Sequence, residues 1–108
     1  MVKSGRRRSK TKLTKLKITE NDVKRAVKDY LNIKGWFHFH ILQGVGSFKG
    51  IPDIIAIKEG RVVFLEIKRP KGNQSQYQRQ FQIFIESHGG EYYVVRCLED
   101  LMKIIEGR

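Results

Sequence analysis

The sequence predicts one α/β domain, built on a mixed four-stranded sheet flanked by helices, behind a disordered basic N-terminal tail. Three observations predict this fold. Apolar residues recur at helical spacing in separate segments, β-branched runs lie between those segments, and glycines or polar turns divide them. A chain of 108 residues has room for one domain and one modest core. The elements that form this core must therefore also carry any functional site.

The first predicted elements are a helix and a strand. Apolar spacing predicts a helix over about residues 20–34, and its start at Thr19 resembles a capping box. Residues 36–42 then alternate apolar and polar side chains, as a strand does. His38 and His40 share one face of this strand, where they would either bind a transition metal or form a plain polar face. We favour the polar face, because no nearby residues complete a zinc site.

Two apolar runs, residues 51–58 and 61–68, flank Glu59 and Gly60 and predict a β-hairpin. A two-residue turn pairs positions whose numbers sum to 119. Such a turn prefers positive φ at both central positions, which suits glycine but not glutamate. A three-residue turn would shift the register by one residue. We therefore predict a two-residue turn or a β-bulge that restores the same register.

This register sets Asp53 opposite Glu66, so that both side chains point to one face of the sheet. Lys68 lies two residues beyond Glu66 and shares that face. A carboxylate inside an apolar run is costly to desolvate unless a cation or hydrogen-bond donors meet it. Two acids and a lysine are thus predicted to converge. The alternative is that the acids are structural and lie on a solvated sheet face.

The second half of the chain predicts a helix, a strand and a closing helix. Ser75 and Gln78 form a second possible capping box, and the helix that follows ends at Gly89 and Gly90. Residues 92–96 form a largely buried strand, and a short amphipathic helix closes the chain. The predicted order of elements is αβββαβα.

Basic residues concentrate in the N-terminal tail, residues 1–18. The chain has a formal net charge of +11, of which residues 19–108 contribute only +3. The eight basic side chains of the tail repel one another and attract phosphate groups. We therefore predict a disordered nucleic-acid-binding tail ahead of a folded domain over residues 19–108. A solvated tail without a partner and a nuclear targeting signal are the alternatives.

Composition and motif context exclude several classes of protein. The single cysteine, Cys97, excludes an internal disulfide framework and fits an intracellular setting. No apolar stretch reaches the roughly 18 residues of a membrane span, so we expect a soluble intracellular protein without a membrane partner. Gly44-x-Gly46 leads into a strand rather than a helix, which argues against a nucleotide cofactor.

The predicted convergence of Asp53, Glu66 and Lys68 has a definite chemistry. Carboxylate ligands without cysteine favour Mg²⁺ or Mn²⁺. An ion between the acids would polarise a phosphate and lower the pKa of a bound water. Lys68 would orient that water or stabilise the developing negative charge. These are the requirements of phosphodiester hydrolysis, so we predict a metal-dependent nuclease.

Gly-Ile-Pro-Asp at residues 50–53, followed by Glu-Ile-Lys at residues 66–68, resembles the signature of the PD-(D/E)XK nuclease superfamily. Together with Gln78, these motifs look most like a VRR-NUC (virus-type replication-repair nuclease) domain over about residues 19–96. The resemblance implies a restriction-endonuclease-like αβββαβ core. It also implies that Gln78 acts at the site, whereas its position alone equally suits a helix-capping side chain.

The resemblance implies specific roles for the motif residues. Asp53, Glu66 and the Ile67 carbonyl would bind the metal, and Lys68 would be the catalytic lysine. A first-helix acid, here Glu20, would complete the site. The alternative for Glu20 is that its carboxylate only interacts with the positive N-terminus of the helix.

Basic residues beside these motifs and in the tail are candidate phosphate contacts. Lys49 precedes the first motif, and Arg69 and Lys71 follow the second, where a merely solvated basic edge is the alternative. The tail candidates are Arg6, Arg7, Arg8, Lys10 and Lys12.

The expected partner is DNA. The basic tail and the flexible glycines would contact the DNA backbone and would not contact base edges. We therefore expect an endonuclease that selects DNA structure rather than sequence. Its substrates would be branched, flap or junction DNA in replication, recombination or repair. Similarity to small Holliday-junction resolvases implies a homodimer, since this chain is too small for two sites. The alternative is a non-catalytic basic nucleic-acid-binding domain.

Overall fold

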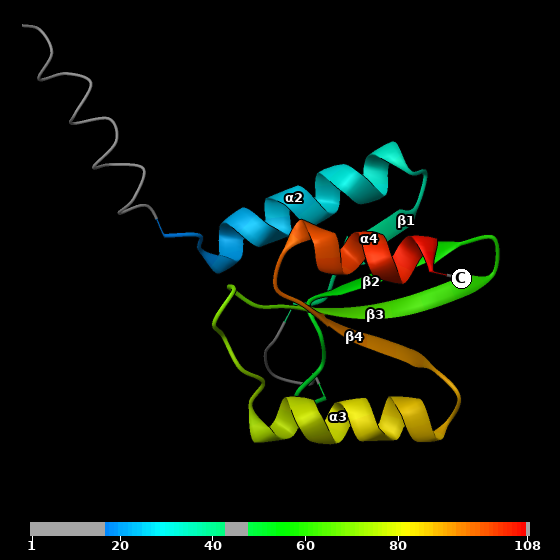
Figure 1. Ribbon diagram of the computed structural model, residues 1–108. Coiled ribbons are helices and arrows are strands. Elements are labelled where there is room, and N and C mark those ends of the chain that lie inside the picture. Colours follow the sequence, from blue (N-terminus) through cyan, green and yellow to red (C-terminus); the bar gives the residue numbers. More distant parts are fainter. Residues whose placement is uncertain (1–16, 43–47, 108) are drawn as a thin grey trace, which may run out of the picture.

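The computed structural model describes residues 17–42 and 48–107. Within them, four strands form one mixed sheet in the order β1-β2-β3-β4. Figure 1 shows α2 and α4 over one face of this sheet and α3 on the other. The predicted α/β class and order of elements are thus confirmed. The elements are α2 (Glu20–Ile33), β1 (Phe37–His40), β2 (Ile54–Lys58), β3 (Arg61–Ile67), α3 (Gln76–Ser87), β4 (Glu91–Val95) and α4 (Leu98–Glu106).

The first helix, α2, begins as the sequence predicts. Thr19 Oγ1 accepts a hydrogen bond from the Asp22 backbone N–H, and Asp22 Oδ2 accepts one from the Thr19 N–H. This reciprocal pair satisfies two donors that a helix start otherwise leaves unpaired. The apolar stripe of Val23, Val27 and Leu31 is buried against the sheet and α4. The cap and the stripe together fix the helix end that lies nearest the candidate site.

The strand β1 is shorter than predicted, since it covers Phe37–His40 rather than residues 36–42. Its polar face packs beneath α2, where His38 Nε2 donates a hydrogen bond of 2.8 Å to Asn32 Oδ1. The aromatic side chains of Phe37 and Phe39 are instead exposed and contact each other, with ring centroids 5.6 Å apart. Alternation predicted the two faces correctly but did not indicate which face a helix would cover.

The β2–β3 hairpin has the two-residue turn that we predicted. Glu59 and Gly60 both have positive φ, +50° and +83°, and the paired positions run from Lys58 with Arg61 to Ile54 with Leu65. The residue numbers of every pair therefore sum to 119, which is the predicted register. The turn matches the right-handed twist of the strands, although a glutamate in the left-handed region is strained.

A parallel pairing completes the sheet and forms the core. β3 pairs with β4 in parallel, with α3 as the crossover helix between them. Lys68 N–H continues this pairing by donating to the Val95 carbonyl at 2.9 Å. The main apolar core lies between the sheet and the helices α2 and α4. Its fully or nearly fully buried members are Val23, Val27, Leu31, Trp36, Ile54, Ala56, Val63, Leu65, Ile67, Val95 and Leu101.

The turn generates a stability prediction. Replacing Glu59 with asparagine, which tolerates the left-handed region, should raise the free energy of unfolding by about 0.5–1 kcal/mol. Urea unfolding of the wild type and the variant measures the difference. Glu99→Asn, an exposed change within the first turn of α4, is the control. A Glu59→Asn variant that is no more stable than the wild type would contradict the strained turn.

Candidate active site

The carboxylates of Asp53 and Glu66 meet at the end of the hairpin. Glu66 is 3% exposed and lies in β3, one residue before the strand ends. Asp53 lies one residue before β2, outside the strand in which the sequence suggested it. Its backbone carbonyl accepts from the Ile41 N–H, while its Oδ2 accepts from the Ile67 N–H at 2.7 Å. The Asp53 side chain thus takes the place of a strand partner and holds its carboxylate beside β3.

The two oxygens of Glu66 have different surroundings. Oε2 accepts a hydrogen bond of 2.7 Å from Gln78 Nε2 and lies 3.6 Å from Lys68 Nζ. Oε1 is buried and has no hydrogen-bond partner. Burial, together with the nearby negative charge of Asp53, raises the pKa of Glu66 to about 8, although the Lys68 ammonium acts in the opposite direction. A buried carboxylate oxygen without a donor is an available ligand for a cation.

Gln78 serves both its helix and the site. Ser75 Oγ accepts from the Gln78 backbone N–H, and Gln78 Oε1 accepts from the Ser75 N–H at 2.7 Å, which completes a capping box. Because Oε1 is committed to Ser75, the amide nitrogen of Gln78 must face Glu66. Gln78 therefore caps α3 and contacts the site at the same time, and the start of α3 orients a Glu66 oxygen.

Lys24 is a site residue that the sequence interpretation missed. Its Nζ lies 3.4 Å from Glu20 Oε2 and 3.5 Å from Asp53 Oδ1, and its side chain is 24% exposed. These carboxylates raise the pKa of Lys24, against the opposing effect of burial. Glu20 is thus linked to Asp53 through a lysine rather than by direct contact. The spacing of Glu20 and Lys24, four residues apart on one helix, was the signal for their pairing.

A hollow of about 400 Å³ lies beside these residues. Glu20 and Lys68 both line it, so the first-helix acid and the lysine that directly follows β3 face a common space. Arg69 lines the same hollow, whereas the exposed Lys71 is not among its lining residues. Lys49 lies elsewhere, with its Nζ 4.8 Å from the centroid of the Tyr77 ring. The tail candidates, Arg6, Arg7, Arg8, Lys10 and Lys12, lie outside the described residues.

The donor set suits a hard divalent ion bound by few protein ligands. Among residues 17–42 and 48–107, no three His, Cys, Asp or Glu side chains gather as a metal site. An ion would therefore bind the carboxylates of Asp53 and Glu66, with a backbone carbonyl such as that of Ile67, water or substrate as further ligands. Mg²⁺ and Mn²⁺ accept this arrangement, and the unpartnered Oε1 of Glu66 fits it. His38 and His40 belong to no such group among these residues, and His38 is instead hydrogen-bonded to Asn32.

The described part of the chain contains no helix long and apolar enough to cross a membrane.

Comparison with known structures identifies the fold. A solved structure described as a VRR_NUC domain matches with a TM-score of 0.70 and 21% sequence identity, over 81% of this chain and 94% of that chain. The chain therefore has the fold of a VRR_NUC domain, as the sequence motifs suggested. No family model and no curated protein matches the sequence.

The pKa of Glu66 generates a prediction for the metal-free protein. The folded carboxyl holds its proton up to about pH 8, whereas an unfolded one loses it near the ordinary value of 4.5. Unfolding between these pH values therefore releases a proton. The free energy of unfolding should fall as pH rises through this window, by up to about 1.4 kcal/mol per pH unit from this group.

Urea unfolding at pH 5, 6, 7 and 8 in EDTA measures this slope. Glu66→Gln should remove the Glu66 contribution, while Glu59→Gln, at an exposed carboxylate, should keep it. Equal slopes in the wild type and Glu66→Gln would show that the Glu66 pKa is not raised.

Proposed function

We propose that this VRR_NUC-fold domain is a nuclease that hydrolyses phosphodiester bonds in DNA with Mg²⁺ or Mn²⁺. The observation that carries the proposal is the pair of Asp53 and the buried, partly unpartnered Glu66 carboxylate, with Lys68 beside them. A purely structural acid pair would be expected to have every oxygen matched to a donor. The fold of the matching solved domain supports the same interpretation.

The residues of the site divide the work of hydrolysis. Asp53 and Glu66 would hold the ion, which when bound supplies a Lewis acid for the phosphate and a more acidic water. Lys68 carries a positive charge 3.6 Å from Glu66 and faces the hollow, where it stabilises the negative charge that develops on the phosphate. Gln78 orients Glu66 through the hydrogen bond to Oε2. Arg69, which lines the hollow, positions the substrate backbone.

The finer proposal concerns substrate and assembly. Residues 17–42 and 48–107 contain one candidate site, whereas a junction has two strands to cut, so we propose a homodimer that acts on branched DNA as an endonuclease. The exposed pair of Phe37 and Phe39 lies on β1, at an open edge of the sheet, and is an apolar surface suited to a second copy. The competing function is a basic nucleic-acid-binding domain without catalysis, which the net charge of +11 alone would also support.

A substrate panel tests this proposal. The protein is incubated with linear duplex, flap and four-way junction DNA in Mg²⁺, Mn²⁺ or EDTA. We expect metal-dependent cleavage that Asp53→Ala and Glu66→Ala abolish and that Lys68→Ala slows by roughly 10²–10³-fold. Lys103→Ala, on the exposed side of α4, is the matched control for the lost charge.

The outcomes separate the two functions. Paired cuts across the junction would support the dimer, whereas cleavage of flap DNA alone would remove the junction from the proposal. DNA that binds in every lane and remains intact with both metals would support the non-catalytic domain.

Lys24 generates a second prediction. Its ammonium neutralises Asp53 at the position where a divalent ion would act, so Lys24→Met should strengthen Mn²⁺ binding by roughly three- to tenfold. Isothermal titration of Mn²⁺ into the wild type and the variant measures this change. Lys103→Met makes the same change in net charge away from the site and should leave the affinity unaltered. Weaker Mn²⁺ binding in Lys24→Met would show that Lys24 supports the site instead of competing with the ion.

A further inference from the structure

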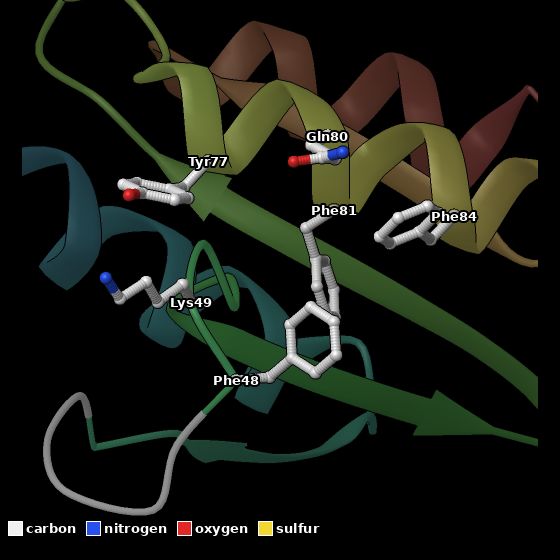
Figure 2. A pocket seen from close by; sticks show the side chains of 6 residues that line it. All are labelled: Phe48, Lys49, Tyr77, Gln80, Phe81 and Phe84. Atoms are coloured by element: carbon white, nitrogen blue, oxygen red, sulfur yellow. The ribbon is translucent and has the colours of Figure 1, made fainter.

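A second concave surface lies beside the candidate active site. We call it the aromatic pocket. It has a volume of about 330 Å³ and lies between α3 and the segment that leads to Asp53. Figure 2 shows side chains from both segments turned toward it. The pocket is lined by Phe48, Lys49, Tyr77, Gln80, Phe81 and Phe84.

Three of the four rings in the aromatic pocket are exposed. Tyr77, Phe84 and Phe48 are 53%, 43% and 57% exposed, whereas Phe81 is only 9% exposed. Phe81 packs edge-on against Phe64 of the sheet, so its ring has a structural role. Phe48 packs edge-on against Phe81, with ring centroids 5.4 Å apart, and Phe84 packs edge-on against Phe48 at 6.3 Å, while much of each of these two side chains stays exposed. A cluster of exposed aromatic side chains on a small domain indicates a binding surface.

The two segments that line the aromatic pocket, α3 and the segment that leads to Asp53, also contribute Gln78 and Asp53 to the candidate active site. Gly50 has a φ of +82°, and a Cβ atom there would overlap the Tyr77 carbonyl oxygen, so only glycine permits this close approach. Three residues after Gly50, the chain reaches Asp53. Tyr77 directly precedes Gln78, whose amide donates to Glu66. A ligand on the Tyr77 ring is therefore adjacent to the residues that would act on the phosphate.

The charges of the aromatic pocket indicate what it binds. Lys49 Nζ lies 4.8 Å from the centroid of the Tyr77 ring, at an exposed position. Gln80 adds an amide that can donate and accept hydrogen bonds. Flat exposed rings, a cation and an amide match a nucleotide, whose base stacks and whose phosphate pairs with the lysine. An apolar partner protein would leave Lys49 and Gln80 without a function in the contact.

We propose that the aromatic pocket binds an unpaired base of the nucleic acid that is cleaved at the neighbouring site. This inference rests on the proposed nuclease function and names its substrate class, a strand with an unpaired nucleotide next to the scissile phosphate. The base stacks on Tyr77 in place of the Lys49 ammonium, which turns to contact the phosphate of that nucleotide. A fully paired duplex keeps its bases stacked in the helix and gains nothing from the pocket.

Binding measurements in EDTA test the inference without cleavage. Two DNAs of equal length are compared by fluorescence anisotropy, one a full duplex and the other a duplex with a single-stranded arm that carries 2-aminopurine beside the junction. Tyr77→Ala should weaken binding of the armed DNA by roughly 5- to 150-fold, the loss that follows when a stacked base loses its aromatic partner. Binding of the full duplex should change less than about twofold.

Two variants control for side effects. Tyr77→Phe keeps the ring and should restore both the affinity and the quenching of 2-aminopurine fluorescence. Ile83→Ala removes an apolar side chain of α3 that is also exposed but does not line the pocket, and it should have no effect. Circular dichroism confirms that each variant is folded.

The outcomes distinguish this inference from the proposed function. Equal loss of affinity for both DNAs, or no loss for either, would overturn the base-binding pocket while metal-dependent cleavage by the wild type still stood. A change from dimer to monomer in Tyr77→Ala and Phe84→Ala, with DNA binding unaltered, would show that a second copy of the chain occupies the pocket. Absence of cleavage by the wild type would overturn the proposed function.

Discussion

The site depends on one constraint, the burial of the Glu66 carboxylate within an apolar strand. A carboxylate that is 3% exposed loses most of its hydration, and only part of that loss is offset here by Gln78 and Lys68. One oxygen has no partner, and the pKa is raised to about 8. The fold retains a destabilising group at a fixed position. A divalent ion bound to Glu66 would give the unpartnered oxygen a positive partner and would offset the cost of burying the carboxylate.

The architecture keeps that group in place through three separate elements. The two-residue turn sets the register of β2 and β3, and this register brings Asp53 to the end of the hairpin near Glu66. The capping box of α3 orients the Gln78 amide, which donates a hydrogen bond to Glu66 from the face of the sheet that α3 covers. Helix α2 contributes Lys24, which offsets the charge of Asp53. The capping box that begins α3 and the turn that joins β2 to β3 thus also position the candidate metal ligands.

Much of this arrangement follows from local sequence. Alternation along β3 and into Lys68, the residue that follows it, puts Glu66 and Lys68 on one face. A two-residue turn fixes the partner of each hairpin residue. Both rules depend only on backbone geometry. The salt bridge from Lys24 to Asp53 does not follow, because it depends on how α2 crosses the sheet. The exposure of Phe37 and Phe39 was not foreseen for the same reason. Alternation separates two faces, but only the position of a helix decides which face it buries.

The proposed function requires that Asp53 and Glu66 bind a divalent ion together. Anomalous diffraction from a crystal of the protein soaked in Mn²⁺ tests this requirement most directly. We expect one peak per chain, about 2.1–2.3 Å from an oxygen of each carboxylate and bound to Glu66 Oε1. A crystal without that peak, in which Oε1 stays unpartnered or is met by a lysine, would contradict the shared ion.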